Sequence, residues 1–413
     1  MRVMLIAMAI STAAVMSWAQ TTTLPPQPRP MNDSTLALAD TSGVPQRDVF
    51  DLLRKILGKR VEPQFDYTPK TGLQWALLPT FSVNPVYGAA FGVMVSGAGR
   101  RGTTRARYSQ LAISANVSTL GQVQAQVRGG IFSSGETFLL QVDLRYLDTE
   151  RSTWGLGPIN EEPGGEYPMQ FVLGRAYATA LRVVSGPVYV GLGFHFDQFS
   201  DIVDELAEEG ELTPYLEYSR GLPSVTTAVG LSFDVVADTR DNAIDPLEGY
   251  YLNWSFRDYL ETFGSDNNWQ ELWVEARVYP HLPKHSKNVL AFWLYGWLSF
   301  GNAPYLNLPS NGWDTYGRGA RGYLAGRIRG IDQIYIESEY RWSLTADGLW
   351  GMVVFVNGTS TTTESGIFGR LDYAAGTGLR VKFNKHTSSN LTLDYGWGRA
   401  DSHGFFLGMS EAF

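Results

Sequence analysis

Few residues of this 413-residue chain have the types and spacing that chemistry would need. His195 and Asp197, with serines elsewhere, suggest a hydrolase, but no strand–turn–helix segment marks a nucleophile. His281 and His285 could chelate a metal on a helix, yet they lie in a predicted proline-containing turn. The glycines of residues 317–326 lack the Lys-Ser/Thr ending of a phosphate loop. We therefore predict no catalytic site, no metal, no cofactor and no enzymatic activity.

The composition excludes several classes of protein. No cysteine is present, which excludes disulfides and thiolate metal sites. A net charge of -8 argues against nucleic acid as a partner, because phosphate binding needs clustered Lys and Arg. Beyond the N-terminus, no run approaches the roughly 20 apolar residues of a membrane-spanning helix. With 44% apolar residues, 18% charged residues and 44 glycines, polar and apolar side chains must be interleaved, as they are in sheets.

The N-terminus indicates export. Arg2, the apolar stretch over residues 3–15 and the small-residue pattern at residues 17–19 predict a secretory signal peptide over residues 1–19. A single membrane anchor is the alternative, but the apolar segment is short. Residues 20–46 are rich in Thr, Pro, Ser and Asp, and this composition predicts a flexible periplasmic lead.

From residue 74 to residue 413 the dominant period is two, in segments of roughly ten residues separated by Gly, Asn, Asp and Ser. Leu140 and Leu144, for example, would face one way while Asp143 and Arg145 face the other. About sixteen such segments occur, and an even number suits a bacterial barrel with both termini in the periplasm. The predicted fold is therefore all-β: a closed antiparallel transmembrane β-barrel of about 16 strands over residues 74–413.

The connections between these segments alternate in length, which predicts the orientation of the barrel. Long connections, expected on the extracellular side, lie around residues 149–168, 201–225, 301–331 and 358–368. Short turns, expected in the periplasm, lie around residues 133–135, 185–186 and 346–348.

Aromatic residues near the segment ends add two expectations. Two groups are expected in aromatic girdles at the membrane interfaces: Trp293, Tyr295 and Trp297, and Tyr340 and Trp342. Alternating apolar residues lead to the terminal Phe413, which predicts a last strand ending in a C-terminal sorting signal, although Glu411 breaks the apolar row.

Residues 47–59 predict one short amphipathic helix before the barrel. Its apolar residues recur at helical spacing: Val49, Phe50, Leu53, Ile56 and Leu57. Three positions remain open for this helix: packed against the barrel mouth, inside the lumen, or at the membrane surface. Packing against the barrel is the favoured one.

Three segments resemble the BamA/TamA superfamily, also called the bacterial surface antigen family, whose barrels have sixteen strands. The triplet Arg321-Gly322-Tyr323 resembles the family's VRGF/Y motif, which lies in extracellular loop six and folds back into the lumen. The strand count places residues 301–331 in that same connection. The segments "GTGLRVKF" and "LTLDYGWG" are similar to the family's last strands.

A further segment, "DTRDNAIDPLEGYYLNWSF", resembles a family motif with an acidic-basic start and a Pro-x-x-Gly turn. We assign it to a periplasmic turn. Its motif residues are Asp238, Arg240, Asp241, Pro246 and Gly249.

The motif arginine needs acidic partners in a polar lumen, because charge-assisted hydrogen bonds would hold it there. The inward faces of the last strands offer Glu337, Glu339, Asn357, Asp372 and Asp394. The family usually has Phe-x-Asp where this chain has Phe-Val-Asn at residues 355–357. Because Asn357 is neutral, we expect Glu339 to be the ionic partner. The alternative is that Arg321 is a single solvated loop arginine.

The resemblance implies a protein of the Gram-negative outer membrane that assists insertion or translocation of protein or lipid. Its expected partners are outer-membrane lipids, lipopolysaccharide, and a polypeptide substrate or separate periplasmic protein. Family members carry periplasmic POTRA domains, but the roughly 50 mature residues before this barrel predict none. A weak seam between first and last strands is the implied mechanism. The alternatives are a passive channel or surface-exposed structural antigen and, least favoured, a barrel phospholipase or protease.

Overall fold

The computed structural model describes residues 44–59, 71–84, 88–103, 106–159, 165–219, 221–284, 286–363, 365–385 and 387–413. The predicted signal peptide and most of the predicted lead lie outside these residues. Within them, no helix is both long and apolar enough to cross a bilayer.

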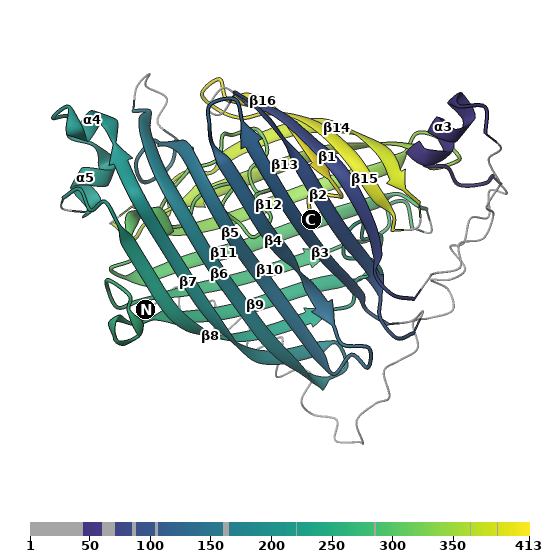
Figure 1. The fold of residues 1–413 in the computed structure, drawn as a ribbon, viewed down its shortest axis with the longest axis horizontal. Helices are drawn as coiled ribbons and strands as arrows, with labels where there is room; N and C mark the ends of the chain where they lie inside the picture. Colours follow the sequence, from purple (N-terminus) through teal and green to yellow (C-terminus); the bar gives the residue numbers. More distant parts are fainter. Residues whose placement is uncertain are drawn as a thin grey trace.

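In the described part of the chain, sixteen antiparallel strands form one sheet in which each strand pairs with its neighbours in the chain (Figure 1). The first eight are β1 (Gln74–Asn84), β2 (Gly88–Arg100), β3 (Tyr108–Ser118), β4 (Val123–Phe132), β5 (Phe138–Thr153), β6 (Tyr167–Ser185), β7 (Val188–Asp204) and β8 (Thr226–Asp238). The second eight are β9 (Tyr250–Tyr259), β10 (Trp269–Val278), β11 (Val289–Gly301), β12 (Asp332–Ser343), β13 (Trp350–Thr361), β14 (Asp372–Asn384), β15 (Ser389–Trp397) and β16 (His403–Met409). The predicted all-β class and number of strands are confirmed.

The sheet curls so that its two halves face each other across an interior (Figure 1). The hydroxyl of Tyr108, at the start of β3, donates to the carbonyl of Thr387 in the β14–β15 turn at 3.2 Å. No pairing between β1 and β16 is found in the described part of the chain. The closed ring of hydrogen bonds therefore stays a prediction.

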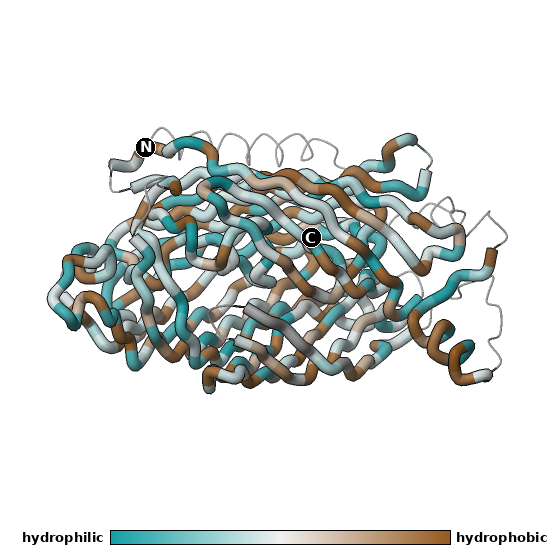
Figure 2. The backbone as a smooth tube through the Cα atoms, turned by 90° about the horizontal axis from the view of Figure 1, so that it is seen from above, coloured by the Kyte–Doolittle hydropathy of each residue, from teal (hydrophilic) through white to brown (hydrophobic). Residues whose placement is uncertain are grey.

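Along much of the sheet, polar side chains face the interior and apolar side chains alternate with them on the outer face. On β12, Glu337 and Glu339 are fully buried, whereas Ile336 is 50% exposed. Leu144 of β5 is exposed while its neighbour Asp143 is buried, as the sequence predicts. Figure 2 shows this interleaving as alternating brown and teal along the tube. Along this part of the sheet, the enclosed face is therefore the polar one.

Long and short connections alternate between the two ends of the sheet, as predicted. The β7–β8 connection holds the helices α4 (Glu205–Glu208) and α5 (Pro214–Ser219), which lie at the left in Figure 1. The β9–β10 and β11–β12 connections at the same end contain the short 3-10 helices η1 (Glu261–Phe263) and η2 (Tyr305–Asn307). The opposite end carries shorter turns and helix α3 (Val49–Ile56), which packs against β14.

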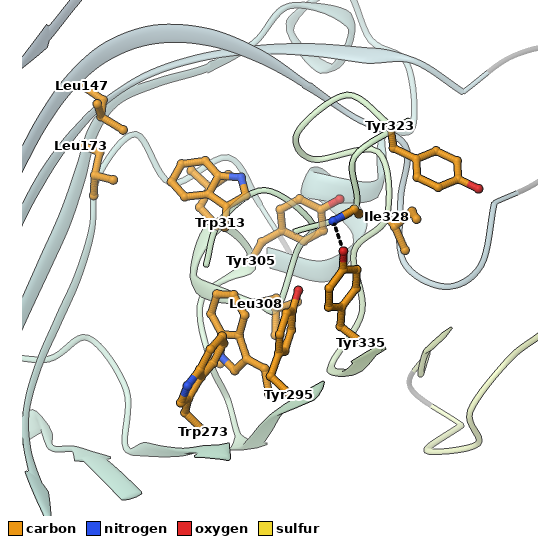
Figure 3. Close-up of a cluster of buried hydrophobic side chains, with 14 of the residues drawn as sticks. Leu147, Leu173, Trp273, Tyr295, Tyr305, Leu308, Trp313, Tyr323, Ile328 and Tyr335 are labelled. Atoms are coloured by element: carbon orange, nitrogen blue, oxygen red, sulfur yellow. Dashed lines mark hydrogen bonds between the residues drawn. The ribbon is translucent and has the colours of Figure 1, made fainter. Parts of the chain in front are cut away.

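An aromatic core fills part of the interior. Trp293, Tyr295 and Trp297 of β11 are buried, so the expectation that they form an interfacial girdle is wrong. β11 carries apolar residues on both of its faces. The alternation of polar and apolar residues is therefore absent from this strand, and the sequence could not predict which face turns inward. Tyr295 stacks on Trp273 of β10 and Tyr335 of β12, each with ring centroids 4.8 Å apart (Figure 3).

Candidate functional site

Loop six, the connection over residues 302–331 between β11 and β12, folds into the interior. At one side, the side-chain amide of Asn307 donates to the carboxylate of Asp197 on β7 at 3.1 Å. At the other side, the backbone N–H of Ala320 donates to the hydroxyl of Tyr335 on β12 at 3.0 Å, as drawn in Figure 3. Because β7 and β12 lie five places apart in the sheet, the loop crosses the interior.

Loop six is held in shape by its own side chains. The carboxylate of Asp314 accepts bonds from the backbone N–H groups of Arg318 and Gly319, at 3.0 and 2.8 Å. The guanidinium of Arg329 donates to the carbonyl of Tyr305 at 2.9 Å and contacts that of Leu308. Such internal bonds give the loop a fixed shape with which it presents residues 318–323 to the wall.

Arg321 is the centre of the site. Only 4% of its surface is exposed, and its guanidinium contacts three carboxylates. Its Nε lies 3.1 Å from Glu337, Nη2 lies 2.5 Å from Glu339, and Nη1 lies 2.5 Å from Asp394. The guanidinium also lies 3.8 Å from the centre of the Phe355 ring. Contacts to several carboxylates at once, together with an aromatic ring face, suit the planar guanidinium with its five donors better than any other cation.

The structure brings together most, but not all, of the predicted partners of the motif. Glu339 does pair with Arg321, and it shares that arginine with Glu337 and Asp394. Asn357 donates to the backbone carbonyl of Arg321 at 2.9 Å, so its amide holds the loop rather than the guanidinium. Asp372 does not contact Arg321, because its carboxylate accepts the backbone N–H of Ile159 at 2.8 Å.

Gly322 and Tyr323 fit the motif against β14 and β15. Gly322 has a φ of 111°, and a Cβ at this position would lie 2.7 Å from the Cβ of Ala374. The hydroxyl of Tyr323 donates to the carbonyl of Tyr373 at 2.5 Å and accepts the backbone N–H of Arg399 at 2.9 Å. Only glycine combines this backbone conformation with so close an approach.

Two further arginines extend the site along the wall. Arg341 of β12 lies 2.6 Å from Glu339, and Arg380 of β14 contacts Asp394. Arg380 also lies 2.8 Å from Glu411, which follows β16. We call this set the interior ion cluster: Arg321, Glu337, Glu339, Arg341, Arg380, Asp394 and Glu411.

The last strand does not reach the terminus, contrary to the sequence prediction. β16 ends at Met409, and Ser410, with a φ of 72°, turns the chain inward. The ring of Phe413 is buried 5.4 Å from that of Trp293, and its carbonyl accepts a bond of 2.9 Å from Arg341. The apolar row breaks at Glu411 because this residue leaves the strand for the interior. A sorting role for Phe413 stays a prediction.

Loop six holds this C-terminal tail, residues 410–413. The guanidinium of Arg318 donates to the carbonyl of Met409 at 2.7 Å and to that of Glu411. The side chain of Glu411 also accepts the amide of Asn390 on β15 at 2.7 Å. The end of the last strand is therefore tied both to loop six and to the wall.

The second predicted motif is a compact turn between β8 and β9. The carboxylate of Asp238 accepts the guanidinium of Arg240 at 2.8 Å, and Gly249 has a φ of 92° at a point where it touches the backbone of residue 239. Asp241 accepts the backbone N–H groups of Leu247 and Glu248 at 3.0 and 3.2 Å. Burial nonetheless raises the pKa of Asp241 to about 6.

This turn also contacts the interior ion cluster. The carbonyl of Pro246 accepts a bond from Arg341 at 3.3 Å, and that of Ile244 accepts the backbone N–H of Glu411 at 3.1 Å. Arg341 therefore contacts the turn and the tail, and Glu339 links it to Arg321 of loop six. Sequence reasoning missed Arg341, although its spacing of two from Glu339 placed it on the same inward face.

The described residues His195, Ser232 and Asp234 are not arranged as a hydrolytic triad. His195 Nε2 lies 2.9 Å from the Ser232 hydroxyl, which in turn donates to Asp234 at 2.5 Å. In a hydrolytic triad the acid orients the histidine, whereas here it binds the serine. His285 lies outside the described residues, and within them no group of three His, Cys, Asp or Glu side chains is placed to hold a metal ion.

No family model matches the sequence, and no curated protein matches it. Solved structures do match the fold. One is the crystal structure of BamA from Haemophilus ducreyi lacking POTRA domains 1-3, with a TM-score of 0.52 and 16% identity over 83% of this chain and 70% of that chain. Another is CdiB from Escherichia coli, with a TM-score of 0.53 and 12% identity over 83% of this chain and 63% of that chain. The fold is therefore similar to those of BamA and CdiB.

Proposed function

We propose that this protein is a Gram-negative outer-membrane β-barrel that assists the insertion or translocation of protein or lipid. The observation that carries the proposal is Arg321, buried among three carboxylates on a loop that crosses the interior. The likeness of the fold to BamA and CdiB supports it. Its partners would be outer-membrane lipids, lipopolysaccharide, and a polypeptide substrate or a separate periplasmic protein.

The outer surface supports a location in a membrane. Large apolar side chains point outward from strands around the whole sheet, and many are half exposed or more, such as Leu77, Leu192, Ile336 and Phe405. A patch of this extent is unfavourable in water but suits the hydrocarbon region of a bilayer. Backbone polar groups within a closed barrel would all be paired, which the hydrocarbon also requires.

The first and last strands support a seam that can open. β16 has seven residues, whereas β6 has nineteen. β1 contains Pro79, which has no N–H group to donate to a neighbouring strand. A pairing between so short a strand and a strand that lacks one donor would be weak. Arg318 of loop six also binds the carbonyl of Met409, at the end of β16. Movement of the loop would therefore move the seam.

A passive channel is the less favoured alternative, because loop six and the tail occupy the interior, where a cavity of about 140 Å³ is found. We also propose that the protein is not an enzyme, since the hydroxyl of Ser232 donates to Asp234 rather than to the imidazole of His195.

The proposal is tested by depleting the protein in its native host and quantifying outer-membrane proteins and outer-leaflet lipids. Complementation uses the wild type, Arg321→Ala and the control Arg327→Ala, which changes a loop-six arginine outside the interior ion cluster. We expect barrel proteins or surface lipids to fall on depletion and to recover with the wild type and the control only. Normal levels after depletion would favour the channel or surface antigen.

A further inference from the structure

Helix α3 has an apolar half and a polar half. At 3.6 residues per turn, one side carries Val49, Phe50, Leu52, Leu53, Ile56 and Leu57, and the other carries Asp48, Asp51, Arg54 and Lys55. In a globular domain the apolar half of such a helix packs on the core. In Figure 2 this helix is the largely brown coil at the right-hand end of the molecule.

The polar half of α3 makes the hydrogen bonds and the ion pair that hold the helix on the barrel. Asp48 and Asp51 are buried and reciprocally cap the start of the helix. The carboxylate of Asp51 lies 2.6 Å from the ammonium of Lys385 in the β14–β15 turn, and that of Asp48 accepts the backbone N–H of Lys385 at 3.2 Å. Arg47 donates its backbone N–H to the carbonyl of Asp347 in the β12–β13 turn at 3.1 Å. Two turns at the same end thereby fix the helix.

The helix lies on the outer side of the wall. The ring of Phe50 packs edge-on against that of Phe383 on β14, with centroids 5.0 Å apart. Phe383 is itself buried, at the point where the register between β14 and β15 shifts, while Leu379 and Tyr373 farther along β14 are exposed outward. In Figure 1, α3 lies beyond the right-hand end of the sheet, outside the space between its two halves. Of the three positions left open by the sequence, the lumen is therefore excluded, because α3 packs against the outside of the barrel.

The rest of the apolar half has no partner in the described structure. Leu52 and Leu53 are 41% and 47% exposed, and Ile56 and Leu57 are 71% and 69% exposed. These side chains lie next to the end of β14, whose residues Leu379 and Tyr373 are exposed on the apolar outer surface. Lys55 and Lys59 are exposed beside them. An apolar face flanked by cations, joined to a membrane-facing wall, fits the region of lipid headgroups and upper acyl chains.

We infer that α3 is an interfacial anchor whose apolar half lies in the periplasmic leaflet of the outer membrane, with its lysines among anionic phospholipid headgroups. The inference rests on the proposed location of the barrel in that membrane. Lipid is favoured over a polypeptide partner because the exposed face lies next to the outer wall of the strands and carries a basic flank.

The test uses the absence of cysteine from the chain, so that one introduced cysteine carries one polarity-sensitive fluorophore. The full-length protein is folded into vesicles of phosphatidylethanolamine and phosphatidylglycerol, with or without brominated acyl chains. The label is placed by Ile56→Cys on the helix, by Leu379→Cys on the outer wall as the reference, and by Gln46→Cys on the exposed segment before the helix as the control.

We expect the labels at positions 56 and 379 to shift to shorter wavelength and to be quenched by brominated lipid, and the label at position 46 to do neither. A label at position 56 that stays in water, beside a quenched label at position 379, would overturn the inference while leaving the barrel in the membrane. A blue-shifted but unquenched label at position 56 would also overturn it, since protein would then cover the face. No quenching at position 379 would instead contradict the proposed location of the barrel itself.

Discussion

At the scale of single residues, Arg321 joins loop six to two strands that do not pair with each other. It contacts Glu337 and Glu339 on β12 and Asp394 on β15. Three buried carboxylates without this guanidinium would repel one another in a medium that solvates charge poorly. The contribution of Arg321 is therefore best measured by removing it.

We expect Arg321→Ala to lower the free energy of unfolding by about 3–5 kcal/mol, the usual effect of breaking a buried ion pair. Arg321→Lys should recover only part of the loss, because one ammonium cannot reach three carboxylates and the ring of Phe355 together. Urea unfolding in vesicles measures both, with Arg327→Ala as the matched control. Equal stability of Arg321→Ala and Arg327→Ala would show that the ion pairs contribute nothing.

Gly322→Ala is expected to displace the motif from the wall. The added Cβ would lie 2.7 Å from that of Ala374, and the φ of 111° is strained for alanine. The matched control is Gly348→Ala, since Gly348 has a φ of 67° with nothing within 4 Å of the added carbon. Limited proteolysis should cut loop six faster in the first variant only. Similar cleavage of both would mean that the wall does not select glycine here.

The motif triplet and its partner Glu339 could be predicted, because the resemblance located the loop and the period of two placed the acid inward. Arg341 and Arg380 lay on predicted inward faces as well. Alternation along a strand predicts which side chains point inward, but it does not predict which inward side chains of different strands lie at the same height in the barrel. Asp372 shows the same limit: it faces inward, yet at the level of Ile159 and away from Arg321.

At the scale of elements, the tail of residues 410–413 links loop six to the last strand. Arg380 binds the side chain of Glu411, while Arg318 binds its carbonyl. The sequence showed only a broken apolar row here, because a change of backbone direction at one serine leaves no periodic signal. On β11 the period likewise failed, since both faces are apolar.

Glu411→Gln is expected to release the tail. The neutral amide keeps the size of the side chain but loses its charge beside Arg380 and Arg341, which lie 2.8 and 3.9 Å away. Carboxypeptidase should then remove Phe413 from the folded variant faster than from the wild type. The control is Asp401→Asn, which neutralises an exposed acid in the β15–β16 turn. If carboxypeptidase removed Phe413 at the same rate from all three proteins, the ion pairs of Glu411 would not be what holds the tail.

At the scale of the whole molecule, an apolar outer wall surrounds an interior that holds an ion cluster and an aromatic core, with one loop across the middle and a short strand at one edge. The alternation of polar and apolar residues predicted the strands that form the wall. The lengths of the connections predicted at which end of the sheet each connection lies. Contacts between loop six, the β8–β9 turn and the tail could not be predicted, because each depends on how far three separate segments reach into one interior.

The most direct test of the central claim is the rate at which an unfolded outer-membrane barrel inserts into vesicles that contain this protein. Protease protection of the inserted client gives that rate for empty vesicles, the wild type, Arg321→Ala and Arg327→Ala. We expect the wild type and Arg327→Ala to accelerate insertion and Arg321→Ala to lose most of the acceleration. If vesicles with the wild type insert the client no faster than empty vesicles, the account of this protein as an insertion factor is contradicted.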